Sequence, residues 1–308
     1  MLPAQDDNSF SIRRMTLPRE SKAGGDIGLH LGQDSSPDSI IRLPDCGGPT
    51  MEAPRIANPS FELNAQGVHV WSVGTEVSEA NARRLGRLLA LDERNRAARF
   101  RFDEVRHSFI VARGALRILL GRYLNASPVG VQFKYGFNGK PALESALRPI
   151  EFNTSHSGGL VMLAFTIGCE IGIDLEHIRP IQGMQGIADR FFCEEEAMEL
   201  ALLSVEQRQR AFFLCWSRKE AHIKAIGSGL STPLNSFRVT THPSQPARLI
   251  YCAHEASDAN EWTLHDLQVD SRYVAALAYR GAERTVTAFP LIHSAELLKI
   301  AEPNIPCI

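Results

Sequence analysis

The sequence has few of the features that mark secreted, membrane or nucleic-acid-binding proteins. Its six cysteines are scattered, without a C-x-x-C pair or a regular spacing, which indicates reduced thiols and a cytoplasmic protein rather than a disulfide framework. The longest apolar runs, such as Leu160–Ile167, are too short to span a bilayer. At the N-terminus, acidic residues precede any apolar stretch, so we expect no secretory signal. A formal net charge of −2 gives no general attraction to nucleic acid.

What the sequence does contain is two short segments that together offer three carboxylates and a lysine. The first, GIDLE at Gly172–Glu176, is expected to be a strand, so that Asp174 and Glu176 lie on one face, away from the core. The second, WSRKEAHIK at Trp216–Lys224, is expected to be a helix. Its Trp216, Glu220 and Lys224 recur every four residues and therefore share one face.

Carboxylates brought together by these two segments would attract a cation. A pair of like charges ~4 Å apart repels by about 4 kcal/mol at an effective dielectric of ~20. Neither histidine nor cysteine stands beside the acids at a metal-binding spacing, and a set of oxygen ligands favours Mg²⁺ or Mn²⁺ over zinc. Magnesium shares its coordination with phosphates, so the pattern indicates chemistry on a phosphate ester or a pyrophosphate.

Each segment alone is more often structural, since a D-x-E strand face and a K-E pair on a helix are both common on solvated surfaces. Two further segments strengthen the functional interpretation: GFNGKPAL at Gly136–Leu143 and FNTSHSGG at Phe152–Gly159. Both are rich in small residues that suit a phosphate site. Lys140 in the first of them is a natural phosphate partner.

Read in order, GKP, NTSHS, GIDLE and WSRKEAHIKAIGSGL resemble the motif series of the 4′-phosphopantetheinyl transferase superfamily. The W-x-x-K-E-A form is similar to the larger, surfactin-synthetase-activating (Sfp-like) type. The resemblance extends over roughly Val68 to Pro290. It implies an enzyme that transfers the 4′-phosphopantetheine arm of coenzyme A to a serine of apo acyl or peptidyl carrier protein domains. Adenosine 3′,5′-bisphosphate would be released.

The resemblance also implies roles for individual residues. The metal ligands would be Asp174, Glu176 and Glu220, and the catalytic residues would be Glu220 and Lys224. Glu220 would be the base that accepts the serine proton, directly or through a metal-bound water, and Lys224 would lie near the phosphates. Residues expected to contact coenzyme A are Arg96, Lys140, Pro141, Ser155, His156, Lys219 and Lys224.

Some of these positions have a structural alternative. The arginine run around Arg96 is by default a solvated helix face, and Lys224 a snorkelling surface lysine. Lys219 is either a phosphate contact or the partner of a nearby carboxylate. Trp216 is expected to pack and so to position Glu220.

Two other functions are compatible with the same residues. A metal-dependent hydrolase of the coenzyme A pyrophosphate would use similar acids, and a non-catalytic relative would only bind carrier proteins. A serine hydrolase is not favoured, because no G-x-S-x-G elbow surrounds the S-H-S segment. The carrier served and the choice between Mg²⁺ and Mn²⁺ are not determined.

The fold class expected is α+β, with helices followed by strands in each half. The resemblance implies a pseudo-dimer of two similar halves in one chain, each a small antiparallel sheet packed with helices, and a monomer. Residues 1–66, rich in Gly, Pro, Ser and Asp, are expected to form a flexible N-terminal extension. Residues 67–168 would be the N-terminal half, 169–290 the C-terminal half with the metal site, and 291–308 a tail.

Within these halves, apolar periodicity predicts the individual elements. A strand is expected at Val68–Val73, one helix through Ala80–Phe100 and another over Val105–Tyr123. Residues 160–166 and 170–175 are expected to pair as a hairpin that turns at Gly168. An acidic helix from Glu194, the Trp216 helix and four further strands complete the prediction, the strands near 237–241, 248–252, 263–269 and 273–279.

Overall fold

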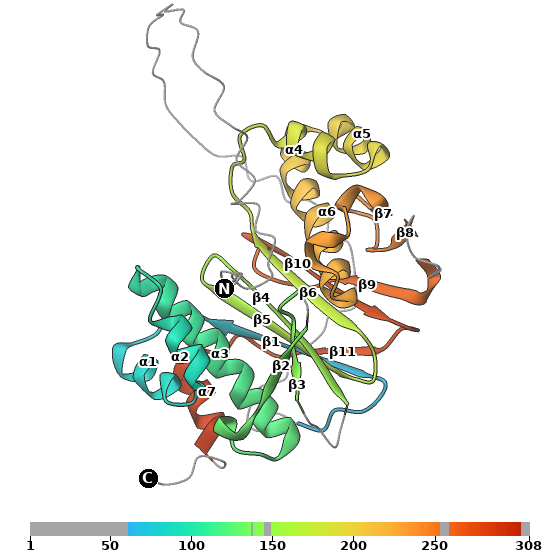
Figure 1. Cartoon of the computed structure of the whole chain (residues 1–308). Helices are drawn as coiled ribbons and strands as arrows, with labels where there is room; N and C mark the ends of the chain where they lie inside the picture. The colour runs from blue at the N-terminus through green and yellow to red at the C-terminus, as the bar shows by residue number, and fades with distance from the viewer. Residues whose placement is uncertain (1–60, 137, 145–148, 253–258, 303–308) are drawn as a thin grey trace, which may run out of the picture.

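The fold is a stack of four layers in which two mainly antiparallel sheets lie between two long helices (Figure 1). The structure, a computed structural model, describes residues 61–136, 138–144, 149–252 and 259–302. The predicted extension therefore lies, except for residues 61–66, outside the described residues. In the described part no helix is long and apolar enough to cross a membrane.

The first half is a sheet covered by one long helix. Its strand order is β11-β1-β5-β4, and helix α3, Asp103–Leu124, packs on its outer face. Alternate residues of the strands, such as Trp71, Leu163 and Phe165, contact this helix, as the period of two requires. The strands are β1 (Gly67–Gly74), β4 (Ile150–Ser157), β5 (Leu160–Ile167) and β11 (Thr285–Ala288).

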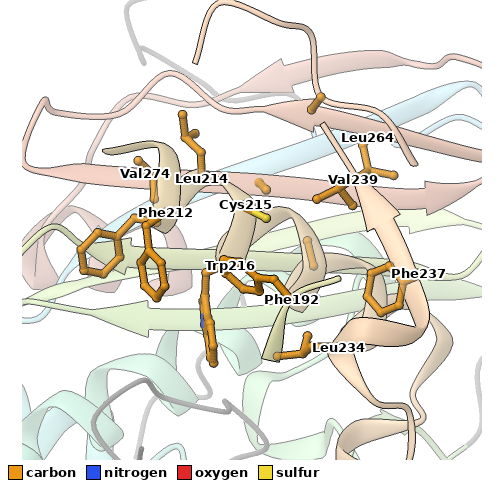
Figure 2. Close-up of a cluster of buried hydrophobic side chains, with 14 of the residues drawn as sticks. Phe192, Phe212, Leu214, Cys215, Trp216, Leu234, Phe237, Val239, Leu264 and Val274 are labelled. Carbon is orange, nitrogen blue, oxygen red and sulfur yellow. The ribbon is translucent and has the colours of Figure 1, made fainter. Parts of the chain in front are cut away.

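The second half repeats this plan with the order β6-β10-β9 and helix α6, Val205–Ile226. Both long helices have 22 residues. The helix side of this half has an aromatic core around Trp216, Phe192 and Phe212 (Figure 2). The predicted packing role of Trp216 is thus confirmed. The strands are β6 (Ile171–His177), β9 (Trp262–Asp266) and β10 (Tyr273–Arg280), and the smaller helices are α4 (Met184–Phe191) and α5 (Glu194–Leu202).

The inner faces of the two sheets form a third core. Val68, Val70 and Met162 of the first sheet lie against Ile173 and Leu277 of the second. These buried positions alternate with the positions that face α3 or α6, so both faces of β6 are covered. The predicted fold class, α+β with a pseudo-dimer of two similar halves, is confirmed.

Short elements connect the layers. They are α1 (Glu79–Gly86), α2 (Leu91–Ala97), α7 (Ser294–Ala301), β2 (Phe133–Tyr135), β3 (Pro141–Leu143), β7 (Phe237–Val239) and β8 (Leu249–Cys252). Single 3-10 turns occur at Pro128–Gly130, Gly229–Ser231, Leu234–Ser236 and Ala259–Glu261.

The predicted hairpin of residues 160–166 with 170–175 is wrong. β5 pairs with β1 and β4, whereas β6 pairs with β10, so Gly168 lies in a crossing from one sheet to the other. The prediction failed because two adjacent apolar strands with a glycine between them look the same whether they pair or separate. Instead, β6 lies beside β4 (Figure 1).

The predicted helix through residues 80–100 is also corrected, because the chain forms α1 and α2 with a break between them. At the break, the Glu93 side chain accepts a hydrogen bond from the Ala90 backbone N–H at 2.8 Å. The helix over 105–123 and those around Glu194 and Trp216 are confirmed as α3, α5 and α6.

The end of the described chain returns to the first half. β11 pairs in parallel with β1, and α7 buries Leu297 and Leu298 in the core around α3. Residues 294–301 are therefore a packed helix rather than a tail, because their apolar residues share one face.

Candidate active site

The acids of β6 and the lysine of α6 meet where this helix lies directly on the strand. A Cβ atom at Gly172 would be 2.1 Å from the Ala221 carbonyl oxygen and 2.4 Å from the Ala225 nitrogen. Only glycine permits so close an approach of helix to strand. The expectation that the acids face away from the core is therefore corrected: Asp174 and Glu176 lie beneath α6, 3% and 6% exposed.

Ser155 joins strand β4 to this cluster. Its Oγ donates to Asp174 Oδ1 at 3.2 Å and accepts from the Lys224 Nζ at 3.0 Å and from the Leu175 N–H at 3.2 Å. The Lys224 ammonium also pairs with Asp174 Oδ1 at 2.7 Å. Ser155, Asp174 and Lys224 thus form one buried network.

This network is the central rung of a ladder between β4 and β6. Asn153 Oδ1 accepts from the Ile173 N–H at 3.0 Å, and Ser157 Oγ accepts from the His177 N–H at 3.0 Å. Alternate side chains of β4, in the pattern N-x-S-x-S, therefore accept the hydrogen bonds of the β6 backbone N–H groups that a neighbouring strand's carbonyls would otherwise accept. It fixes the register of the two halves at the site.

Three acidic side chains, those of Asp174, Glu176 and Glu220, lie close to Lys224. Burial, followed by the charge of Asp174, raises the pKa of Glu176 to about 8, although Arg179 and Lys224 oppose this. Burial and then Asp174 also raise the pKa of Glu220 well above its ordinary value. The other oxygen of Asp174, Oδ2, is buried without a hydrogen-bond partner.

These oxygen donors suit a hard cation such as Mg²⁺, because three carboxyl groups lie close together in a poorly solvated place and one of them has an oxygen without a hydrogen-bond partner. The described residues do not, however, include three or more His, Cys, Asp or Glu side chains already arranged to hold a metal ion. One oxygen of Asp174, Oδ1, is paired with the Lys224 ammonium rather than with a metal ion. The predicted metal ligands thus lie near one another without forming a finished ligand set.

A cleft opens beside the network, with walls from both halves. Predicted residues Pro141, Ser155, His156, Lys140 and Lys224 all line it. The remaining lining comes from α3, from the turn before Pro141, from β4, and from the end of α6 with the residues that follow it: Ala112, Arg113, Leu116, Gly139, Asn153, Thr154, Ile223, Gly227 and Gly229. The cleft is therefore lined by residues that are far apart in the sequence, and a ligand that contacts both halves would bind there.

Lys140 reaches the cleft, but its ammonium is engaged. Nζ donates to the carbonyl oxygens of Ile171 at 3.1 Å, Lys224 at 2.7 Å and Ala225 at 3.0 Å. Burial lowers its pKa to about 8, against a smaller opposing effect of Glu151 and Glu170. The predicted contact with a phosphate stays a prediction for this residue.

Lys219 lies elsewhere. It is fully buried, pairs with Glu196 at 2.7 Å and donates to the Leu234 carbonyl at 2.8 Å and the Phe237 carbonyl at 2.5 Å. Of the two roles predicted for Lys219, the structure shows the pairing with a carboxylate. The predicted contact of Lys219 with coenzyme A is therefore corrected. The reason is its position on α6, one residue before Glu220 and so about 100° away around the helix.

Arg96 is on α2, with its guanidinium 5.3 Å from the centre of the Phe109 ring. It is not among the described residues that line the cleft. Its predicted phosphate contact stays a prediction.

A buried ion cluster behind the cleft was not predicted from the sequence. Glu93 accepts from Arg113 Nε at 2.8 Å and from Arg117 Nε at 2.6 Å. Arg113 also lines the cleft and donates to the Tyr135 hydroxyl at 2.9 Å. The i, i+4 spacing of the two arginines was the available signal.

Comparison with known proteins agrees with this arrangement. Residues 170–278 match the family described as the 4′-phosphopantetheinyl transferase superfamily, and residues 76–167 match the family described as 4′-phosphopantetheinyl transferase, N-terminal. The chain is 38% identical to 4′-phosphopantetheinyl transferase HetI of Nostoc sp. over 72% of this chain and 92% of that protein. It is 32% identical to 4′-phosphopantetheinyl transferase Sfp of Bacillus subtilis over 54% of this chain and 72% of that protein.

Among solved structures, holo-acyl-carrier-protein synthase (AcpS) of Thermotoga maritima is 20% identical, with a TM-score of 0.30, over 38% of this chain and 66% of that chain.

Proposed function

The chain belongs to the 4′-phosphopantetheinyl transferase superfamily, and we propose that it transfers the 4′-phosphopantetheine moiety of coenzyme A to a serine of apo acyl or peptidyl carrier protein domains. The co-product is adenosine 3′,5′-bisphosphate. The enzyme class rests on the relatives, with HetI matched over 92% of its length. The observation that carries the proposed reaction is the cleft between the halves, which ends at the network of Ser155, Asp174 and Lys224.

In the proposed reaction, the carrier serine Oγ attacks the phosphorus that bears the pantetheine. The bond from this phosphorus to the bridging pyrophosphate oxygen breaks, and adenosine 3′,5′-bisphosphate leaves. Glu220 accepts the serine proton, directly or through one water. Its burial supports this role, because a carboxylate held in a poorly solvated site has a raised pKa and is a stronger base.

Lys224 supplies fixed positive charge. Its side chain is 7% exposed and its ammonium is held by Asp174 and Ser155, so it needs no reorganisation when charge develops on the phosphates. This burial argues against a merely snorkelling surface lysine.

We propose that Asp174, Glu176 and Glu220 hold Mg²⁺, with Mn²⁺ as the alternative. When bound, this ion would supply charge to offset that of the pyrophosphate. His156 and Pro141 line the cleft and are proposed to contact the nucleotide, with His156 at the 3′-phosphate. We further propose that the protein acts in the cytoplasm as a monomer.

To test the proposal, the protein is incubated with coenzyme A and Mg²⁺, either with or without an apo carrier domain. The adenosine 3′,5′-bisphosphate formed is then measured by chromatography. A transferase forms the nucleotide only with the carrier and in equal amount to holo carrier. Nucleotide formed at the same rate without any carrier would identify a coenzyme A pyrophosphate hydrolase and refute the proposal.

A further inference from the structure

A loop of the first half binds the C-terminal end of helix α6, which belongs to the second. This loop, which connects β2 to β3, carries Asn138 and Lys140. Asn138 Nδ2 donates to the carbonyl oxygens of Gly227 at 2.9 Å and Ser228 at 2.7 Å. Together with the Lys140 bonds described above, two side chains of one short loop bind five carbonyl groups.

Four of these carbonyls belong to the end of α6 and the two residues beyond it: Lys224, Ala225, Gly227 and Ser228. The last carbonyls of a helix have no partner within the helix and carry its negative dipole end. An ammonium and an amide are suitable donors for them. The fifth carbonyl, that of Ile171, is at the start of β6, so Lys140 also ties α6 to the strand that carries Asp174.

A lysine ammonium has three protons, and Lys140 makes three hydrogen bonds to carbonyls. No proton is left for a phosphate oxygen. One of the three acceptors is the backbone carbonyl of Lys224 itself, whose side chain pairs with Asp174.

We propose that Lys140 and Asn138 are positioning residues, which hold the last turn of α6 against β6 so that Lys224 and Glu220 keep their places over the acids of the strand. This inference rests on the proposed function and deepens it. It gives Lys140 a different task from the phosphate contact predicted from the sequence. Its consequence is that this loop, together with the ladder between β4 and β6, holds the two walls of the cleft in place.

The test uses Lys140→Met and Asn138→Asp, which remove hydrogen-bond donors with little change of size. Lys134→Met is the control, since Lys134 is an exposed lysine on β2, just before the same loop. Steady-state transfer is measured with coenzyme A and with 3′-dephospho-coenzyme A, at a temperature where all variants are folded. Hydrogen exchange of the amides in residues 224–229 is measured on the same samples.

Both variants should lower kcat about tenfold to hundredfold, because small displacements of reacting groups have effects of this size. KM for coenzyme A should change less than threefold, and the loss should be equal for the two substrates. The double variant should lose little more than either single one, since the two side chains act as a unit. Exchange at residues 224–229 should accelerate in both variants and remain unchanged in Lys134→Met.

Two results would overturn the inference. One is a rise in KM of tenfold or more with kcat unchanged in Lys140→Met alone, which would make this lysine a phosphate ligand. The other is wild-type kinetics and exchange in Asn138→Asp. A wild-type protein that transfers nothing to any carrier would refute the proposed function instead, and the exchange measurement would still decide whether the loop holds the helix.

Discussion

The close contact between α6 and β6 predicts a strong effect of a single methyl group. In Gly172→Ala, the new Cβ would lie 2.1 Å from the Ala221 carbonyl oxygen, 2.4 Å from the Ala225 nitrogen and 2.9 Å from the Lys224 carbonyl carbon. All three are backbone atoms of one helix, and none can rotate out of the way. The helix must therefore move away from the strand.

The distances give the size of this movement. For the contact to lengthen from 2.1 Å to the ordinary separation of 3.4 Å, α6 must recede by about 1.3 Å. Overpacking of this kind destabilises a protein by about 1–3 kcal/mol. A displacement of about 1 Å between reacting groups lowers a rate about 100-fold. Because Asp174 lies on the strand and Lys224 and Glu220 on the helix, we expect kcat to fall about 100-fold.

The assay is transfer to an apo carrier domain, measured per folded molecule where the near-ultraviolet circular dichroism of the variant equals that of the wild type. Gly186→Ala is the control, because a Cβ at this glycine of α4 meets nothing within 4 Å except its chain neighbours and the helix's own backbone. It should retain full activity and gain up to about 1 kcal/mol of stability. A Gly172→Ala variant with kcat within threefold of wild type would refute the argument that strand and helix must touch for the site to work.

Three further predictions follow from the site and its core. Asp174→Ala and Glu220→Gln should each abolish transfer in the intact-mass assay, while Glu220→Gln retains coenzyme A binding by calorimetry; turnover like that of the wild type in either would remove that residue from the mechanism. His156→Ala should weaken coenzyme A about tenfold but 3′-dephospho-coenzyme A much less, as loss of a charged hydrogen bond implies; equal weakening would contradict the 3′-phosphate assignment. His222, buried between aromatic rings of which Trp262 is one, has a pKa lowered to about 4 by burial and then by Lys219. Its charged form is therefore favoured in the unfolded chain, which binds more protons below the ordinary value of 6.5. Stability should thus fall by about 2 kcal/mol from pH 7 to pH 5 through this residue alone, and His222→Phe should remove that part of the slope in urea unfolding with chelator present; an unchanged slope would contradict it.

The elements of the fold were largely predictable because their periodicity is local. The alternation of GIDLE places Asp174 on one face of β6 and Leu175 on the other, whatever the strand pairs with. Gly227 ends α6 in a left-handed conformation, as its place in the sequence predicts. Partner choice is not local, and this is why the expected hairpin across Gly168 was wrong.

The site was predictable where a motif names the residue and its face, as for Ser155 and Lys224. It was not predictable where a side chain turns to a distant partner. Lys219 and Glu220 are neighbours in the sequence, yet one pairs with Glu196 in the core and the other lies near Asp174. The engagement of Lys140 by helix carbonyls depends on a contact between the two halves, and no local pattern encodes it.

Phosphopantetheine transfer by this protein can be measured as the intact mass of apo carrier domains after incubation with the protein, coenzyme A and Mg²⁺, with and without chelator. A matched carrier with its acceptor serine replaced by alanine serves as the control. We expect the wild-type carrier to gain the mass of one phosphopantetheine, chelator to prevent this gain, and the carrier without its serine to stay unmodified. A panel of acyl and peptidyl carriers that all remain unmodified by folded protein would contradict it.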